Sequence, residues 1–170
     1  MNSGPYLYID ADSCPRQIRS IILKAVVKRH FSSIFVANRL LPDVTKIENK
    51  KLVDNFGTPL VQMIVVENKE DSADDKLVEL ALEGTIAITR DIILADRLIN
   101  KGLTVLDDRG NIYTKENIKS RLSERNVMTQ MRQWGIFAEK TKAMGAKEVQ
   151  AFANALDYQL TILEKKVKQK

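Results

Sequence analysis

Strand and helix signals alternate between residues 6 and 108 of this 170-residue chain. Short apolar runs, which are typical of strands, are separated by segments whose apolar residues recur at helical spacing. We expect strands at 6–10, 34–38, 61–67, 85–91 and 103–108, and helices at 16–31, 43–57, 72–84 and 92–102. About five strands that alternate with helices predict an α/β fold of three layers, in which helices cover both faces of a central parallel sheet.

Individual residues mark the expected ends of these elements. Pro15 stands where the first helix should begin, and Ser72 is a candidate N-cap. Gly57 and Gly84 are expected to end the helices that precede them. Residues 61–67 form the most continuous apolar run, so we expect a fully buried strand there.

The alternation stops after residue 108. Two long helices are expected instead, one over 114–135 with Thr114 as its N-cap and one over 147–167. The sequence contains no internal repeat and no recognisable linker. We therefore expect a single domain, 1–170, in which residues 111–170 form a helical C-terminal extension.

Composition excludes several classes of protein. No apolar run approaches the ~20 residues of a membrane helix, and the N-terminus lacks the features of a secretory signal. Cys14 is the only cysteine, which excludes an intrachain disulfide and a cysteine-based zinc site. We expect a cytoplasmic protein without a membrane partner.

The net charge of +5 is unevenly distributed along the chain. Residues 1–108 carry 14 Lys/Arg and 16 Asp/Glu, whereas residues 109–170 carry 13 Lys/Arg and 6 Asp/Glu. An acidic first part joined to a basic second part suggests a metal-binding centre beside a surface for polyanions.

Aspartates collect where the expected strands end. Asp10 ends the first strand, and Asp12 follows it. Further aspartates open the helix after the third strand or follow the fourth and fifth strands, namely Asp71, Asp74, Asp75, Asp91, Asp96, Asp107 and Asp108. Ligands bind at the carboxyl ends of parallel strands, and hard divalent cations prefer oxygen ligands. We therefore predict a Mg²⁺ or Mn²⁺ site formed from Asp10, Asp12, Asp74, Asp75 and Asp91.

Several of these aspartates also have a local structural interpretation. Asp75 could complete a capping box with Ser72, and Asp91 could cap the helix that follows it. Asp12 could cap the first helix. We favour a turn for Asp107 and Asp108, because Arg109-Gly110 follow them.

A covalent nucleophile is not expected. Cys14 has four residues rather than five before Arg19, so the phosphatase loop spacing is absent. The only histidine, His30, lies at the far end of the first helix, where a cationic group suits the helix C-terminus. Cys14 is therefore interpreted as a small packed residue.

Four motifs together resemble the YaiI/YqxD family of bacterial proteins. They are "IDADSCP", "DSADDKLVELA", "ITRDIILADRLINKG" and "RGNIYTKENI", and the resemblance covers roughly residues 6–160. The family is similar to the PIN-like superfamily, whose members are typically metal-dependent nucleases acting mostly on RNA. The resemblance implies a PIN-like fold and a catalytic set of Asp10, one or both of Asp74 and Asp75, Asp91 and Asp96.

Two alternatives remain open. "DADSC" is similar to the start of haloacid dehalogenase-type phosphatases, with Asp10 as nucleophile and Asp12 as acid, but Pro15 predicts an immediate helix and "IFVAN" ends in Asn38 rather than Ser or Thr. The other alternative is a non-catalytic module that binds RNA or protein. For a nuclease, Arg109, Arg121 and Arg125 are the candidates for contact with the nucleic-acid backbone, unless Arg121 and Arg125 pair with Glu124.

Overall fold

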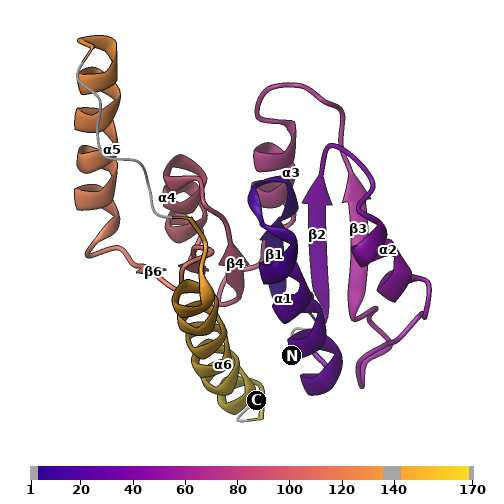
Figure 1. Ribbon diagram of the computed structural model, residues 1–170. Coiled ribbons are helices and arrows are strands. Elements are labelled where there is room, and N and C mark those ends of the chain that lie inside the picture. Colours follow the sequence, from indigo (N-terminus) through magenta and orange to yellow (C-terminus); the bar gives the residue numbers. More distant parts are fainter. Residues whose placement is uncertain (1–3, 136–142, 169–170) are drawn as a thin grey trace.

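A computed structural model describes residues 4–135 and 143–168, and residues 136–142 of the expected C-terminal extension lie outside this range (Figure 1). Its centre is a six-stranded sheet in the order β3-β2-β1-β4-β5-β6. The first five strands run parallel, and β6 pairs antiparallel with β5. The strands are β1 Leu7–Asp10, β2 Ser33–Ala37, β3 Val61–Val65, β4 Ile86–Ile88, β5 Thr104–Leu106 and β6 Ile112–Tyr113. The predicted α/β class is confirmed.

Helices cover both faces of the sheet. They are α1 Arg16–Arg29, α2 Pro42–Glu48, α3 Ser72–Leu80, α4 Ile92–Asn100, α5 Ile118–Gln133 and α6 Ala146–Lys168. Leu7 and Ile9 of β1 pack with α1, α2 and α6, whereas Tyr8 packs with α3, α4 and the start of α5. Because side chains alternate across a strand, Asp10 lies on the same face as Tyr8. The last residue of β1 therefore faces α3 and α4.

The strand order contains one point at which the direction of winding reverses. The chain proceeds from β1 through β2 to β3 on one side, and then returns to place β4 and β5 on the other side of β1. In open parallel sheets such a reversal leaves a crevice outside the carboxyl ends of the two central strands. Asp10 and Asp91 lie at the ends of those strands, β1 and β4.

Two of the predicted elements are wrong in part. The helix expected over 43–57 ends at Glu48, because Lys51 takes a φ of 53° and Asp54 Oδ1 accepts hydrogen bonds from the backbone of Phe56 (2.8 Å) and Thr58 (2.9 Å). Residues 61–67 were expected to form a fully buried strand. They contain β3, which lies at the edge of the sheet, and Val65 is 47% exposed.

The helix starts also differ from the sequence-based expectation. The N-cap of α3 is Asp71 rather than Ser72, and no side-chain bond caps it. The helix expected from Thr114 begins at Ile118, with Asn117 at the N-cap position. Thr114 and Asn117 instead bond to each other's backbone N–H, which satisfies those groups before the helix begins. Strand β6 was not predicted, because two residues carry too little periodicity to detect.

Helix α6 packs on the same face of the sheet as α1. Phe152, Leu156, Leu160 and Leu163 are buried in the core that α1, β1 and β2 also form, in agreement with the predicted helical spacing. By contrast, α5 extends beyond the rest of the structure in Figure 1, and of its apolar residues only Ile118 is fully buried. Met128 and Met131 are half-buried. Among the described residues, no helix is long and apolar enough to cross a membrane.

We predict that α6 is an integral part of the core. Phe152 is completely buried, so Phe152→Ala should lower the free energy of unfolding by about 3–5 kcal/mol through reduced burial and a residual cavity. Tyr158 lies on the same helix and is 62% exposed, so Tyr158→Ala should change stability by less than about 0.5 kcal/mol. Urea unfolding monitored by circular dichroism measures both, and equal effects would contradict the packing described here.

Candidate functional site

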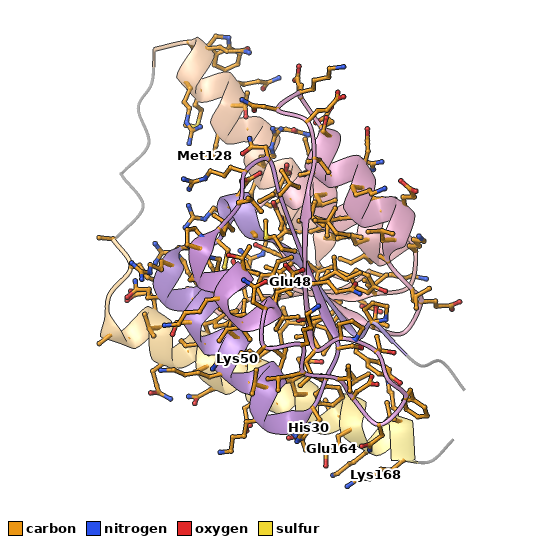
Figure 2. All side chains as sticks on the ribbon, turned by 90° about the vertical axis from the view of Figure 1, so that its right-hand side faces the viewer. His30, Glu48, Lys50, Met128, Glu164 and Lys168 are labelled. Atoms are coloured by element: carbon orange, nitrogen blue, oxygen red, sulfur yellow. The ribbon has the colours of Figure 1, made fainter. Side chains whose placement is uncertain are left out.

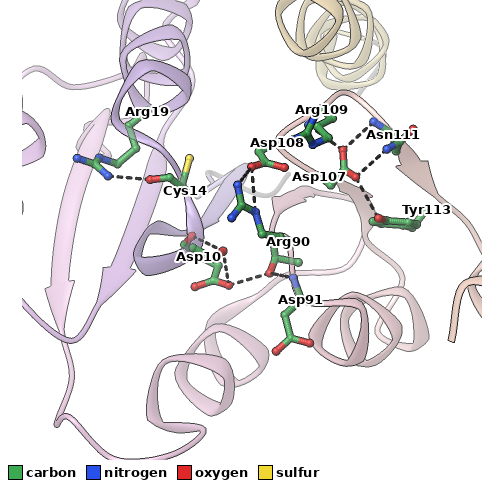
Figure 3. A network of polar contacts seen from close by, with 12 residues as sticks. Asp10, Cys14, Arg19, Arg90, Asp91, Asp107, Asp108, Arg109, Asn111 and Tyr113 are labelled. Carbon is green, nitrogen blue, oxygen red and sulfur yellow. Dashed lines mark hydrogen bonds and ion pairs between the residues drawn. The ribbon is translucent and has the colours of Figure 1, made fainter. Parts of the chain in front are cut away.

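Asp10 is one of three buried carboxyls at the carboxyl edge of the sheet, with Asp107 and Asp108. Its exposed fraction is 6%, and its Oδ2 accepts hydrogen bonds from Thr89 Oγ1 at 2.7 Å and Ser13 Oγ at 2.9 Å (Figure 3). Burial raises the pKa of the Asp10 carboxyl, and the two hydroxyl donors oppose that rise. Oδ1 of Asp10 accepts no hydrogen bond from a described residue, so it remains available to a ligand.

Thr89 joins Asp10 to the start of α4. Its hydroxyl donates to Asp10 and accepts the backbone N–H of Asp91 at 3.0 Å. Asp91 is the N-cap of α4, and its Oδ1 accepts the N–H groups of Ile93 at 2.9 Å and Leu94 at 3.3 Å. Asp91 thus has the capping role that the sequence offered as an alternative to a ligand role, and the cap leaves its second oxygen for other contacts.

Asp74 completes the cluster from the first turn of α3. Burial raises the pKa of the Asp74 carboxyl to about 7, and the negative charges of Asp91 and Asp10 contribute to the rise. A hydrogen bond between the Asp74 and Asp91 carboxyls also favours protonated Asp74 as its donor. Asp10, Asp74 and Asp91, which the sequence placed at one edge, therefore lie close enough for their charges to interact, and a proton reduces their repulsion.

Three other predicted aspartates are oriented differently. Asp12 is exposed, and its Oδ2 accepts the backbone N–H of Asn38 at 2.8 Å, which ties it to the end of β2. Asp75 forms an ion pair with Arg97 of α4 at 3.0 Å instead of a capping box. Asp96 lies in α4, and no hydrogen bond or ion pair joins it to another residue in the described part of the chain.

Asp107 and Asp108 belong to the turn between β5 and β6, as the sequence suggested. Asp107 Oδ1 accepts the backbone N–H groups of Arg109 and Asn111, both at 2.9 Å, and its Oδ2 accepts Asn111 Nδ2 and the Tyr113 hydroxyl. Asp108 is buried and paired with Arg90, whose Nε lies 3.0 Å from Oδ2. Asp107 stabilises the turn and Asp108 binds Arg90, so neither carboxylate is available to the cluster.

Cys14 and His30 have the structural roles expected from the sequence. Cys14 is 5% exposed, and burial raises the pKa of its thiol to about 12, which disfavours the nucleophilic thiolate. His30 follows the last turn of α1 with a φ of 58°. Figure 2 shows it near Glu164 and Lys168, at the end of the molecule opposite Met128.

Sequence analysis missed the residues that position the cluster. Ser13, Thr89 and Arg90 are the polar neighbours that hold Asp10 or line its approach. A partial signal exists, because a threonine two residues before an N-cap aspartate often bonds to the backbone locally. The bond from Thr89 to Asp10 spans 79 residues, and local sequence contains no trace of it.

The donor set is compatible with a hard divalent cation. Mg²⁺ is commonly held by one or two carboxylates, with water and substrate phosphate as the remaining ligands. Ser13 and Thr89 bond to one oxygen of Asp10, and the backbone of α4 bonds to one oxygen of Asp91, while the pKa of Asp74 is about 7, so a cation would favour loss of its proton. Within residues 4–135 and 143–168, however, no three His, Cys, Asp or Glu side chains are arranged as ligands of a single ion.

The three candidate arginines lie around β6 and α5. Arg109 follows β5. Hydrogen bonds from the backbone are the main cause of the lowered pKa of Glu148, and the positive charge of Arg109 lowers it further. Arg121 is 3.9 Å from Glu124, the pairing considered from the sequence, and Arg125 contacts Asn126 at 3.5 Å. Exposed pairs of this length contribute little, so Arg121 and Arg125 can still bind a polyanion.

The comparisons with known proteins agree with the resemblance seen in the sequence. The family model described as "Uncharacterized BCR, YaiI/YqxD family" matches residues 8–162. The chain belongs to the YaiI/YqxD family. A UPF0178 protein of Treponema denticola is 43% identical over 164 residues, which cover 96% of this chain and 95% of that one.

Relatives in Pseudomonas are similar over nearly their whole length. A UPF0178 protein of Pseudomonas putida is 39% identical, with 94% of this chain and 98% of the relative covered. A UPF0178 protein of Pseudomonas fluorescens is 40% identical, with 92% and 96% covered. The family assignment therefore covers the acidic edge, β6 and most of α6.

We predict that Asp74 makes the metal-free protein less stable as the pH rises. Its folded pKa of about 7 lies above the unfolded value of 3.8, so between these values the folded state binds a proton that the unfolded state has released. Stability should therefore fall as the pH rises from about 4 to about 7. Asp74→Asn should reduce that decrease, part of which remains because the pKa of Asp10 is also raised, so the melting temperature of the variant should exceed that of the wild type at pH 8 in EDTA, with the difference shrinking toward pH 4.

Asp75→Asn is the matched control for this experiment. Asp75 lies on the same helix, but its partner is Arg97 at the surface, so its removal should leave the pH dependence unchanged. Differential scanning fluorimetry across the pH series measures both variants. Identical pH profiles for Asp74→Asn and the wild type would show that the carboxyls do not interact as described.

Proposed function

We propose that this YaiI/YqxD family member is a PIN-like, metal-dependent cytoplasmic nuclease that hydrolyses phosphodiester bonds in RNA. The observation that carries the proposal is the convergence of Asp10, Asp74 and Asp91 at the point where the strand order reverses. Three carboxyls brought together there cost repulsion, and a cation would relieve it. The expected Mg²⁺ or Mn²⁺ cofactor is part of this proposal.

Asp10, Asp74 and Asp91 would hold the cation partly through its water ligands, since the described carboxyls are not arranged as three direct ligands of one ion. When bound, such an ion lowers the pKa of a water ligand and neutralises charge on a phosphate. Asp10 is fixed for this task, because Ser13 and Thr89 hold one oxygen and leave the other free. With its pKa near 7, the Asp74 carboxyl is partly protonated at neutral pH without a cation, and positive charge would favour loss of that proton, so binding would be coupled to proton release.

Asp12 and Asp96 have subsidiary places in the proposal. The charge of Asp12 reaches Asp10, although its own carboxylate is held by Asn38. Asp96 lies on α4, after Asp91, and its side chain forms no hydrogen bond or ion pair with another described residue. Either could act on water ligands of the cation, whereas the ion pair of Asp75 with Arg97 argues against a ligand role for Asp75.

RNA is favoured as substrate by the basic second part of the chain and by arginines near the acidic edge. Arg90 binds Asp108 while its side chain is 55% exposed, so it can still face a phosphate. Arg109, Arg121 and Arg125 extend the positive charge over β6 and α5. Phosphate contacts of this kind bind a backbone without reading its sequence.

A non-catalytic module that binds RNA or protein is the second candidate. The raised pKa of Asp74 favours it, because protonation of Asp74 lowers the negative charge of the cluster without a cation, and the described carboxyls are not arranged as three ligands of one ion. The phosphatase alternative is less well supported, since Asp10 is 6% exposed and the carboxylate of Asp12 is held by the Asn38 backbone. Metal-dependent cleavage distinguishes the first two candidates.

The experiment is incubation with RNA, single-stranded DNA and phosphomonoesters in the presence of Mg²⁺, Mn²⁺ or EDTA. We predict cleavage of RNA with metal, none in EDTA, and a melting temperature raised by divalent ions. Asp10→Asn and Asp91→Asn should lower the cleavage rate at least about 100-fold and reduce the thermal shift, because each removes a charge from the cation site.

Two controls make the result specific. Asp75→Asn removes a carboxylate outside the cluster and should retain cleavage and the thermal shift. Cys14→Ala should retain most activity, since a covalent thiol mechanism is disfavoured. Metal-independent cleavage, or a phosphoaspartate trapped at Asp10, would contradict the proposal.

The path of the RNA is tested separately. Arg121→Ala combined with Arg125→Ala should weaken RNA binding and flatten its salt dependence, by roughly 0.7 in the log–log slope for each phosphate that the variant no longer binds. Lys165→Ala with Lys166→Ala removes the same charge from the exposed end of α6 and serves as the control. Fluorescence anisotropy across a salt series measures both, and unchanged binding by the arginine variant would exclude α5 as the substrate track.

A further inference from the structure

A groove between α1 and α2 lies apart from the acidic site. Its volume is about 570 Å³, and it lies on the sheet face covered by α1, α2 and α6, whereas the acidic cluster faces α3 and α4. Leu23 and Val27 of α1 and Ile47 of α2 form its apolar floor. The two helices therefore present a continuous apolar strip between them.

Four cations surround this floor. Arg16, Lys24 and Lys28 line the α1 side, and Lys46 lines the α2 side. All four are exposed, and none forms an ion pair with a residue in the described part of the chain. The other cations of α1, Arg19 and Arg29, are both paired with acids, so the unpaired charge is concentrated at the groove.

The acid in the groove does not offset these charges. Asp43 of α2 forms two hydrogen bonds with Arg19, from Nε to Oδ2 at 2.9 Å and from Nη2 to Oδ1 at 3.2 Å. Arg19 also donates to the carbonyl oxygen of Cys14 at 2.8 Å, which fixes its side chain. Since Asp43 is neutralised by Arg19, the groove has an apolar floor and a strongly cationic rim.

These properties select one kind of occupant. None of the described residues that line the groove is aromatic, so it lacks the stacking platform that single-stranded nucleic acids use. An amphipathic helix buries apolar residues spaced by three and four positions, and acidic residues beside that stripe would meet the rim. Arg16, Lys24 and Lys28 are spaced by multiples of four on α1, so they lie along one helix face at intervals of about 6 Å per four residues.

We propose that the groove between α1 and α2 is a docking site for an acidic amphipathic helix of a partner protein. The partner's leucine-type residues would cover Leu23, Val27 and Ile47, and its Glu or Asp residues would pair with the four rim cations. Docking on this face leaves the acidic edge open, so a partner could bind while the proposed nuclease site acts.

The probe is a fluorescein-labelled synthetic peptide of about four helical turns, with leucines on one face and glutamates beside them. It should bind the full-length protein, with an affinity that falls as salt rises. A peptide with glutamine in place of glutamate should bind at least about tenfold more weakly, because it cannot pair with the rim.

Variants locate the bound peptide. Lys24→Gln with Lys46→Gln should weaken binding about fivefold or more, and Val27→Gln should weaken it through the floor. Lys165→Gln with Lys166→Gln makes the same charge change at exposed positions outside the groove and should leave binding unchanged. Thermal melts verify that each variant is folded, and a floor variant that fails to fold is replaced by Ile47→Gln.

Three results would overturn the proposal. They are equal binding of the glutamate and glutamine peptides, equal weakening by the groove and control lysine variants, and displacement of the peptide by oligouridylate with loss of oligouridylate binding in the groove variant. The last result would assign the groove to nucleic acid. RNA cleavage by the groove variants is measured in parallel. The docking proposal does not depend on that activity, so peptide binding tests it whether or not RNA is cleaved.

Discussion

The hydroxyl of Thr89 is the group on which the organisation of the acidic edge depends. It donates to Asp10 at the end of β1 and accepts from the backbone of Asp91 after β4, so it joins the two strands where the sheet reverses direction. With Ser13 it supplies the hydrogen bonds that keep a buried carboxyl in place. Without such donors, burial next to Asp74 and Asp91 would strongly disfavour the charged form of Asp10.

The acidic cluster and the cationic groove lie on opposite faces of the sheet. Strand alternation directs Asp10 toward α3 and α4, where the other carboxyls of the cluster also lie. The opposite layer contains α1 and α2, with unpaired cations along their shared groove. A proposed catalytic site and a proposed docking site can therefore occur on one small protein without competing for the same surface.

Not every acidic residue at the carboxyl edge of the sheet belongs to the cluster of Asp10, Asp74 and Asp91. Asp107 and Asp108 follow β5, yet Asp107 stabilises the β5–β6 turn and Asp108 binds Arg90. Asp75 is adjacent to Asp74 in sequence, but a step of one residue on a helix turns a side chain by about 100°, and it meets Arg97 instead. The carboxyls that converge are those whose strand or helix face happens to point into the crevice.

Local sequence was sufficient to predict the α/β class, most of the strands and helices, the family, and the placement of Asp10, Asp74 and Asp91 at one edge. These follow from local periodicity, from N-cap and turn residues, and from the rule that parallel strands end together. The folded chain was needed to reveal the edge position of β3, the short α2, the bonds of Asp107 within its turn, the pairing of Asp75, and the contact of Thr89 with Asp10. Most of these depend on residues distant in sequence, because strand order and side-chain direction are set by packing across the whole sheet rather than by neighbours along the chain.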